Sequence, residues 1–389
     1  MQLLRFGRTP APGPDDLATN GPLALRRMAG IVNILRRDRR PDDCRPPRTA
    51  VLMRDVGIGD LVWHAPYFQK IAAQSEGSRV TLFVPPSTHA RDLVGHESWV
   101  HDVVDFDRRP RHLERRTGRH SGLSGLLELA QQFADRAHER VVIFTPRPLP
   151  ASFACWWAGV PHRIGFGAPA QRWLLSRASR FERYDGPGVA AYWHATALCN
   201  THGWCDGPLV PRLNVRQDAL DRMRAALATV AGPRCALAIG SSESFKQWGT
   251  ARFTALAELL ASRGHGVLLV GGPAERAMAD EILGALPPPL RSRVLAMTNR
   301  SVADTVAAMT LVDICIGNDT GAANIAAAVG TPTWVILGPR PLLLHNPAKL
   351  RMIRAASLED IDPRQVLAQV CGELEADGHA HRLADRLPA

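Results

Sequence analysis

The sequence lacks any uninterrupted apolar stretch that approaches the roughly 20 residues a helix needs to span a bilayer. Its first residues, MQLLRFGRTPAPGPDD, lack the apolar core of a signal peptide, so we expect the protein to be made and kept in the cytoplasm. Aromatic residues make up only 6% of the chain and do not interleave with the basic ones. Because no recognisable nucleic-acid-binding module is present either, we expect no nucleic-acid partner.

Cysteine is also scarce. The seven cysteines are scattered and odd in number, which argues against a disulfide framework and fits a reducing compartment. One stretch, HATALCNTHGWC, holds four possible metal ligands, His194, Cys199, His202 and Cys205. Their spacing matches no standard zinc pattern, and the stretch is typical of a helix that packs Cys and Trp into a core. We expect core packing and no metal here, with a metal site as the alternative.

The chain has 389 residues, which is long for one hydrophobic core and comfortable for two domains. Short apolar, strand-like segments alternate with helix-like segments, an order typical of parallel sheets in α/β proteins. The strand-like segments are 49–53, 79–85, 100–106, 140–146, 234–240, 265–272, 313–317 and 331–338. The helix-like segments are 61–74, 124–139, 250–264, 273–286, 301–312 and 322–330.

The alternation stops at a Pro-rich stretch near 206–216 and then restarts, so we predict two doubly wound α/β halves in tandem. The predicted division is a basic N-terminal extension at 1–47, domains at 48–208 and 216–355, and a C-terminal helix and tail at 356–389. In such sheets ligands bind at the carboxyl ends of the strands. With two halves, the expected site is the cleft between them.

The net charge is +10, and the positive excess is concentrated in two places. Arg26–Arg40 lie in a segment whose residues Leu25, Met28, Ile31, Val32 and Leu35 share one helical face, which suits an anionic membrane surface. A helix packed on its own protein is the alternative. The second cluster, DRRPRHLERRTGRH, includes Arg108, Arg109 and Arg111 and could receive a polyanion. Here the alternative is a solvated loop.

The segment Gly57–Asp60 follows the first predicted strand and reads GIGD. It resembles the start of a dinucleotide fingerprint, but Val62 stands where the third glycine would be, so the match is weak. The glycines allow a sharp turn that exposes Asp60 at the start of a helix. A carboxylate in that place is either a helix cap or a general base that takes a proton from a hydroxyl. The helix N-terminus predicts a low pKa for Asp60.

Two further loops have the chemistry of anion sites. In GSSESFKQWG, Lys246 could neutralise a phosphate while Ser241 and Ser242 donate hydrogen bonds to it; the alternative is a polar loop with Trp248 in the core. In GNDTGAAN, Asp319-Thr320-Gly321 stands between a strand and a helix, whose free N–H groups and dipole favour an anion. Two anion sites in one half suggest a diphosphate.

These stretches together resemble glycosyltransferase family 9, the ADP-heptose:lipopolysaccharide heptosyltransferases. The resemblance covers roughly residues 49–340 and is densest over 236–340. Four motifs in register make it specific: GIGDLVWHAPYF, SSESFKQWGTARFTALAELLASRG, VGGPAE and GNDTGAANIAAAVGTPTWVILGP. It implies a GT-B fold of two tandem Rossmann-like domains, with the acceptor in the N-terminal half and the donor in the C-terminal half. It also implies inverting, metal-independent transfer with no cofactor.

The resemblance also implies roles for individual residues. Asp60 would be the general base, and Ser241, Ser242 and Lys246 would contact the donor phosphates. Glu275 would bind the ribose, Asp319 the transferred sugar, and Thr320 and Gly321 the phosphates. The partners implied are a nucleotide-sugar donor, ADP-heptose by this resemblance, and an anionic saccharide or lipid-linked acceptor at the inner face of the plasma membrane. We expect Arg108, Arg109 and Arg111 to contact the acceptor.

The sequence departs from the family pattern at Asn324, where members usually have a histidine three residues after the glycine of Asp-Thr-Gly. Asparagine can hydrogen-bond a sugar or phosphate but carries no charge, which leaves the donor open. The N-terminal extension is also unlike short members, which begin at the first strand.

Three other functions stay open at this point. The spelling Asp105-Phe106-Asp107 fits the Asp-x-Asp of metal-dependent GT-A transferases, although a strand end is the other interpretation. A catalytically inactive nucleotide-sugar-binding protein would keep the fold without the chemistry. A protein O-glycosyltransferase would keep the chemistry and change the acceptor.

Overall fold

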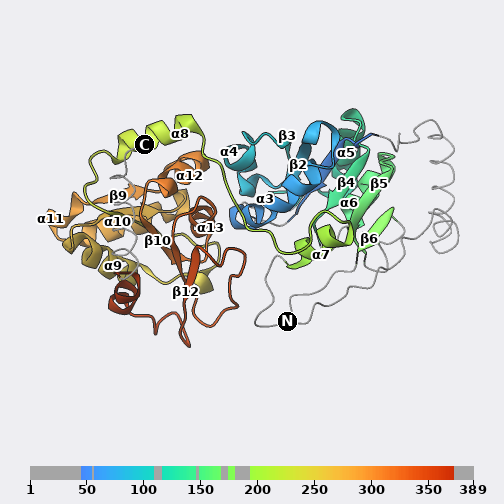
Figure 1. The fold of residues 1–389 in the computed structure, drawn as a ribbon. Helices are drawn as coiled ribbons and strands as arrows, with labels where there is room; N and C mark the ends of the chain where they lie inside the picture. Colours follow the sequence, from blue (N-terminus) through green and yellow to red (C-terminus); the bar gives the residue numbers. More distant parts are fainter. Residues whose placement is uncertain are drawn as a thin grey trace, which may run out of the picture.

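The computed structural model describes residues 45–54, 57–108, 116–145, 149–167, 174–179 and 193–371. Within them the chain forms two six-stranded parallel sheets, one in each half (Figure 1). The N-terminal sheet has the order β3-β2-β1-β4-β5-β6 and the C-terminal sheet the order β12-β11-β10-β7-β8-β9. Read from β9 to β12, the second order repeats the first. Both are the order of doubly wound nucleotide-binding domains.

The strands of the N-terminal sheet are short, and β1, β2 and β4 are buried at every position. They are β1 (Thr49–Leu52), β2 (Val80–Val84), β3 (Val100–Asp105), β4 (Arg140–Ile143), β5 (His162–Phe166) and β6 (Arg177–Ser179). The helices of this half are α3 (Ile58–Ala72), α4 (Ala90–Val94), α5 (Gly122–Asp135), α6 (Leu149–Trp157) and α7 (Trp193–Thr201).

Alternate residues of β1 pack on opposite faces of this sheet, as the two-residue period of a strand requires. Ala50 and Leu52 join the core beneath α5 and α6, whereas Val51 and Met53 join the core that includes α3. Because both faces are covered, the strand reads as a continuous apolar run. The sequence therefore predicted β1 correctly from hydrophobicity alone.

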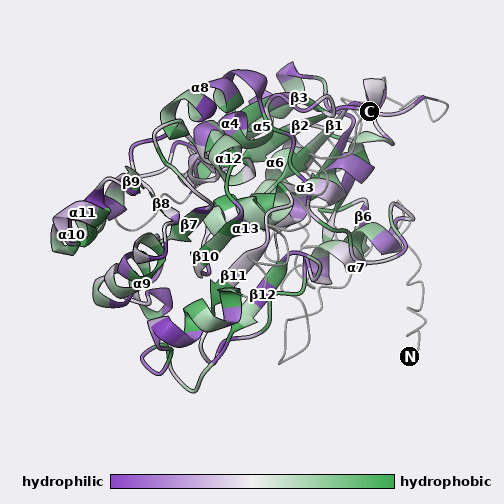
Figure 2. Ribbon diagram, turned by 60° about the vertical axis from the view of Figure 1, so that its left-hand side comes forward, coloured by the Kyte–Doolittle hydropathy of each residue, from purple (hydrophilic) through white to green (hydrophobic). Residues whose placement is uncertain are grey.

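The C-terminal sheet contains β7 (Arg234–Ala238), β8 (Gly266–Val270), β9 (Val294–Met297), β10 (Ile314–Asn318), β11 (Thr333–Ile336) and β12 (Leu350–Ile353). The helices of this half are α8 (Gln217–Leu227), α9 (Thr250–Ser262), α10 (Arg276–Ala285), α11 (Pro288–Arg291), α12 (Val302–Thr310) and α13 (Gly321–Ala328). Residues 363–371 are also helical. Figure 2 shows α13 coloured mainly as hydrophobic, which fits a helix buried against the sheet.

The two halves meet through α3 and α13, which lie side by side between the sheets (Figure 1). One core cluster of buried side chains runs from the N-terminal sheet through these helices into the C-terminal sheet. The linker predicted near 206–216 is fixed on both sides. Glu97 accepts from the backbone N–H of Asn214 at 3.1 Å, and the N–H of Leu213 donates to Ala328 at 3.2 Å. The alternation predicted from sequence is confirmed, with α3 starting three residues earlier than expected.

The residues around the predicted cysteine cluster pack as a helix and its core. Cys199 and Cys205 are buried in the core cluster, and the ring of His202 stacks on Trp204 with centroids 5.0 Å apart. Among the residues that the structure describes, no group of three or more His, Cys, Asp or Glu side chains is arranged to hold a metal ion. None of the described helices is long and apolar enough to cross a membrane.

Candidate active site

The strand order reverses between β1 and β4 in one half and between β7 and β10 in the other. Ligands of open α/β sheets bind outside the carboxyl ends of the strands at such a reversal. Asp60 follows β1, Lys246 follows β7, and Asp319 follows β10. The structure therefore brings three of the residues singled out in the sequence to the two reversal points.

Asp60 is the third residue of α3, and Gly57 is the N-cap. The Asp60 carboxylate accepts a hydrogen bond of 2.8 Å from the backbone N–H of Gly57, which satisfies one of the donors that a helix start leaves open. The cap interpretation and the base interpretation are thus compatible, since only one carboxylate oxygen is used. Among the described residues, no hydrogen bond is made to the other oxygen, Oδ1.

The low pKa expected for Asp60 is wrong. Burial raises the pKa of Asp60 above its ordinary value of 3.8, and the negative charge of Asp319 adds to the rise. The hydrogen bond from Gly57 and the charges of Lys246 and His194 act in the opposite direction but are outweighed by burial. The physical reason is that removing a carboxylate from water costs more here than the helix start returns. Lys246 and Asp319 also act on Asp60 from the other half of the chain.

Two histidines lie near Asp60 in the first turn of α3. His64 Nδ1 lies 2.7 Å from the Asp60 carbonyl oxygen and must donate to it, so its Nε2 accepts from His194 Nε2 at 3.0 Å. Burial lowers the pKa of His64 to about 4, which keeps this ring neutral near pH 7. The sequence analysis did not single out His64, and it considered His194 only as a metal ligand. The short chain of bonds holds His194 near the carboxylate.

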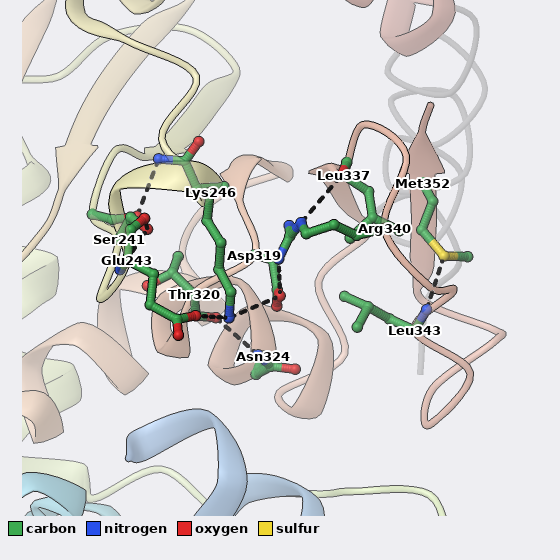
Figure 3. Close-up of polar contacts among 12 residues, drawn as sticks. Ser241, Glu243, Lys246, Asp319, Thr320, Asn324, Leu337, Arg340, Leu343 and Met352 are labelled. Atoms are coloured by element: carbon green, nitrogen blue, oxygen red, sulfur yellow. Dashed lines mark hydrogen bonds and ion pairs between the residues drawn. The ribbon is translucent and has the colours of Figure 1, made fainter. Parts of the chain in front are cut away.

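On the donor side, Lys246 and Arg340 approach Asp319 from opposite sides (Figure 3). Arg340 Nη1 lies 2.8 Å from Asp319 Oδ2, and Lys246 Nζ lies 3.6 Å from the same oxygen. Lys246 also pairs with the half-exposed Glu243 at 2.8 Å. Arg340 was missed in the sequence because it belongs to no motif. It follows β11, the neighbour of β10, so the rule about strand ends could have found it.

The loop that carries Lys246 is fixed by a buried side chain, Asn318, at the end of β10. Asn318 accepts from the N–H of Trp248 at 3.1 Å and donates to the carbonyls of Ile239 and Gly240 at 3.0 and 3.1 Å. Trp248 is fully buried, as the sequence suggested. These bonds tie the end of β7 to the end of β10, so Lys246 is held beside Asp319.

The remaining predicted donor residues lie around the same strand ends. Ser241 donates to the carbonyl of Glu243 at 2.7 Å, and Ser242 is exposed. Glu275 accepts from the N–H of Gly272 at 2.7 Å and lies against Gly240, where an added Cβ would be 3.5 Å from Glu275 Oε2. The carboxylate therefore lies across the ends of β7 and β8.

Thr320 is the N-cap of α13 and Gly321 its first residue. A Cβ on Gly321 would lie 2.8 Å from the Cβ of Ile58, so only glycine permits the starts of α13 and α3 to come this close. The two helix starts, one from each half, consequently border the same space. Asp60 and Asp319 are brought together by this approach.

Asn324 lies at the contact between the halves rather than free in the site. Its Oδ1 accepts from Trp63 Nε1 at 2.6 Å, and its Nδ2 donates to the carbonyl of Thr320 at 2.9 Å. The Trp63 ring in turn lies 4.8 Å from that of His345. The side chain of Asn324 therefore links α13 to α3, a role that its position after Asp-Thr-Gly did not indicate.

The expected acceptor residues are only partly described. Arg108 lies just after β3 and donates to the carbonyl of His120 at 3.3 Å. Arg109, Arg111 and the cluster Arg26–Arg40 lie outside the described residues. In the Asp-x-Asp spelling, Asp105 ends β3 and Asp107 pairs with Arg116. A strand-end role fits both aspartates.

Residues 127–359 match the family model of glycosyltransferase family 9 (heptosyltransferase), which is more than half of the chain. The chain belongs to glycosyltransferase family 9. This family 9 protein is therefore a glycosyltransferase, and the resemblance seen in its motifs is confirmed. It is 25% identical over 296 residues to lipooligosaccharide heptosyltransferase 2 of Haemophilus influenzae, a match that covers 72% of this chain and 81% of that relative.

Two solved structures resemble the family 9 protein along most of its length. The ADP-heptose LPS heptosyltransferase II of Escherichia coli superimposes with a TM-score of 0.68 at 19% identity, covering 85% of this chain and 99% of that chain. The glycosyl transferase family 9 structure from Veillonella parvula gives a TM-score of 0.70 at 16% identity, and the match covers 85% of this chain and 97% of that chain. The fold is the GT-B fold, with two Rossmann-like domains in tandem, as predicted.

Proposed function

We propose that this protein is an inverting, metal-independent glycosyltransferase that moves heptose or a related sugar from an ADP-sugar to a lipopolysaccharide-core or similar envelope saccharide. One observation carries the proposal. A partly buried carboxylate, Asp60, from one half faces the Lys246–Asp319 pair from the other half. Similarity to a lipooligosaccharide heptosyltransferase and to an ADP-heptose LPS heptosyltransferase supports the choice of sugar, nucleotide and acceptor class.

In the proposed reaction the acceptor hydroxyl attacks the anomeric carbon of the donor sugar from the side opposite the diphosphate. Asp60 takes the hydroxyl proton, the new C–O bond forms, and the bond to the diphosphate oxygen breaks. A single displacement of this kind inverts the anomeric configuration. The raised pKa of Asp60 suits this role, because a carboxylate with a higher pKa is a stronger base.

The leaving diphosphate needs positive charge, which the donor half supplies without an ion. Lys246 and the start of α13 at Thr320 and Gly321 would take the diphosphate, with Ser241 and Ser242 as further donors of hydrogen bonds. Glu275 would accept from the ribose hydroxyls. We assign 48–208 as the acceptor domain, 216–355 as the nucleotide-sugar domain, and 356–389 as a C-terminal helix and tail.

The experiment that tests the function is incubation with a panel of nucleotide sugars, with and without excess EDTA, on acceptors prepared from envelope saccharide. Released nucleotide and product mass are measured, and thermal shift reports binding. We expect ADP-heptose to be used and EDTA to leave the rate unchanged. Loss of activity in EDTA would overturn metal independence. Binding without turnover on any acceptor would favour an inactive binding protein, and transfer to polypeptide only would favour the protein O-glycosyltransferase.

The pH dependence of transfer should report the raised pKa of Asp60. A base acts when deprotonated, so kcat/KM should rise with pH through the pKa of Asp60 and level off above it. Since burial raises that pKa, the acid limb should lie above 3.8. Replacing Asp319 with asparagine removes a negative charge that raises the pKa, so the limb should move to lower pH. If Asp319→Asn left the acid limb of kcat/KM unmoved, that limb would not report the ionisation of Asp60.

We further propose that the protein works on the cytoplasmic face of the plasma membrane as a peripheral protein. Two basic segments, Arg26–Arg40 and Arg108–Arg119, add more positive charge than one diphosphate needs. Exposed apolar side chains also lie on the outer helices of the N-terminal half: Leu123 and Leu127 on α5, and Leu149 and Trp157 on α6. Such a mixture of basic and apolar surface suits an anionic membrane.

We expect the protein to sediment with anionic vesicles at low salt and to be partly released at high salt. Each arginine near an anionic surface contributes about 1 kcal/mol and is screened by salt. Deletion of residues 1–47 should weaken binding, and neutral vesicles serve as the control. Replacing Arg108, Arg109 and Arg111 with alanine should raise the KM for acceptor and leave donor affinity unchanged. A protein indifferent to anionic vesicles and to these changes would show both segments to be ordinary solvated surface.

A further inference from the structure

Arg340 is held in place yet incompletely paired. Its Nε donates to the carbonyl of Leu337 at 3.2 Å, and its Nη1 donates to Asp319 Oδ2 at 2.8 Å (Figure 3). The side chain is 16% exposed, and its Nη2 is buried without a hydrogen-bond partner among the described residues. A buried donor left unpaired costs about 1–3 kcal/mol, so such groups usually have a partner. A ligand oxygen would supply one.

Asp319 is incompletely paired in the same way. Its contacts with described residues, the ion pairs with Lys246 and Arg340, both use Oδ2. Oδ1 of Asp319 is therefore left for a ligand, as is the open Nη2 of its ion-pair partner Arg340. Together the paired side chains offer a ligand one acceptor and one donor.

The charges around Asp319 indicate which part of a donor belongs here. Arg340 is neutralised by direct contact with Asp319 at 2.8 Å, so the pair is close to neutral overall. Lys246 is farther from Asp319, at 3.6 Å, and its other partner, Glu243, is 47% exposed. Lys246 can therefore turn to a diphosphate, whereas the neutral Asp319–Arg340 pair suits uncharged hydroxyl groups.

We propose that Arg340 binds the transferred sugar together with Asp319. Nη2 of Arg340 donates to the oxygen of one hydroxyl, and Oδ1 of Asp319 accepts from a neighbouring hydroxyl. This inference rests on the proposed function, since it takes the donor to be a nucleotide sugar. The ligand class it names is a neutral sugar with two neighbouring hydroxyls. Arg340 is a specificity residue for the sugar, and Lys246 serves the diphosphate.

The test compares ADP with ADP-heptose, which carries the heptosyl group on the terminal phosphate. Affinities of the wild type and of Arg340→Ala are measured by calorimetry. Loss of a hydrogen bond to a charged group is worth about 1.5–3 kcal/mol, so ADP-heptose should bind roughly 10-fold to 100-fold more weakly. The affinity for ADP should stay within about twofold. Arg263→Ala, which changes an exposed arginine just after α9, is the matched control and should alter neither affinity.

Two further measurements separate sugar recognition from a structural role. Arg340→Lys keeps a positive charge beside Asp319 but lacks the second branch of the guanidinium, so it should fail to restore ADP-heptose affinity. ADP-heptose analogues that each lack one hydroxyl should include one that binds wild type and Arg340→Ala equally.

The outcomes distinguish this inference from the proposed function. Equal loss of ADP and ADP-heptose affinity in Arg340→Ala would overturn the inference and leave the glycosyltransferase function standing. Full rescue by Arg340→Lys would also overturn it. If the wild type bound neither ADP nor ADP-heptose, the proposed donor itself would be wrong, and so would the role of Arg340 in binding its sugar.

Discussion

Replacing Asp60 with asparagine should lower turnover by about 10²–10⁴-fold, the usual range for loss of a general base. The side chains are nearly the same size, and an amide oxygen can still accept the bond that Gly57 donates to the carboxylate at 2.8 Å. The start of α3 should therefore be preserved. What is lost is the ability to take the acceptor proton. We expect the melting temperature and the affinity for ADP to stay close to those of the wild type.

Asp304 offers a matched control for this change. It is the third residue of α12 after the N-cap Ser301, just as Asp60 is the third residue of α3 after Gly57. Asp304 pairs with Arg222 on α8 at 2.8 Å and lies outside the proposed site. Asp304→Asn should keep turnover within a few-fold of the wild type. If Asp60→Asn behaved in the same way, Asp60 would be a helix cap and nothing more.

The fold could be predicted from the sequence where strands are buried on both faces. β1, β2, β7, β8 and β10 are mainly apolar and almost wholly buried, and their hydrophobic runs alternate with helical segments. The pattern did not indicate β5, β6, β9 and β12; β6, β9 and β12 are outer strands of the sheets, and β5 lies next to β6. β9 and β12 are partly exposed in the middle, and β6 has only three residues. Short strands of this kind carry little apolar signal.

The site was predictable as far as motifs reach. Asp60, Lys246 and Asp319 stand in recognisable loops, and the structure brings them to the strand ends. The raised pKa of Asp60 was not predictable, because it depends on burial that α13 of the other half helps to produce. The close approach of Gly321 to Ile58 is a contact between residues more than 250 positions apart. A sequence reveals the helix start but not what covers it.

Asn324 and Arg340 both show that a motif does not reveal the contacts a residue makes in the fold. Asn324 stands in a motif, yet its oxygen is taken by Trp63 across 261 positions of the chain. Arg340 stands in no motif, yet it contacts Asp319 because β10 and β11 are neighbours with their carboxyl ends at one edge. Motif position alone therefore did not indicate the contact of Asn324 with Trp63, and it missed Arg340. Strand order, once known, accounts for Arg340.

Replacing Lys246 with alanine should weaken ADP binding roughly 10-fold to 100-fold, because a hydrogen bond to a charged group contributes about 1.5–3 kcal/mol. Turnover should fall further, by about 10²–10³-fold, the usual cost of removing a group that stabilises developing charge. The reason is that negative charge grows on the diphosphate as the bond to the sugar breaks. Lys246 is the side-chain cation at the end of β7 whose partner Glu243 is half exposed and can release it.

The loss in Lys246→Ala should come with a shift in the pH profile, and this makes the prediction specific. The positive charge of Lys246 lowers the pKa of Asp60, so its removal should move the acid limb of kcat/KM to higher pH. Asp319→Asn should move it to lower pH, so the two variants should flank the wild type. Lys70→Ala, an exposed lysine in the last turn of α3, is the control and should change neither binding nor the limb. Unchanged ADP affinity and an unmoved acid limb in Lys246→Ala would show that Lys246 does not bind the diphosphate. The start of α13 would then be the remaining diphosphate site.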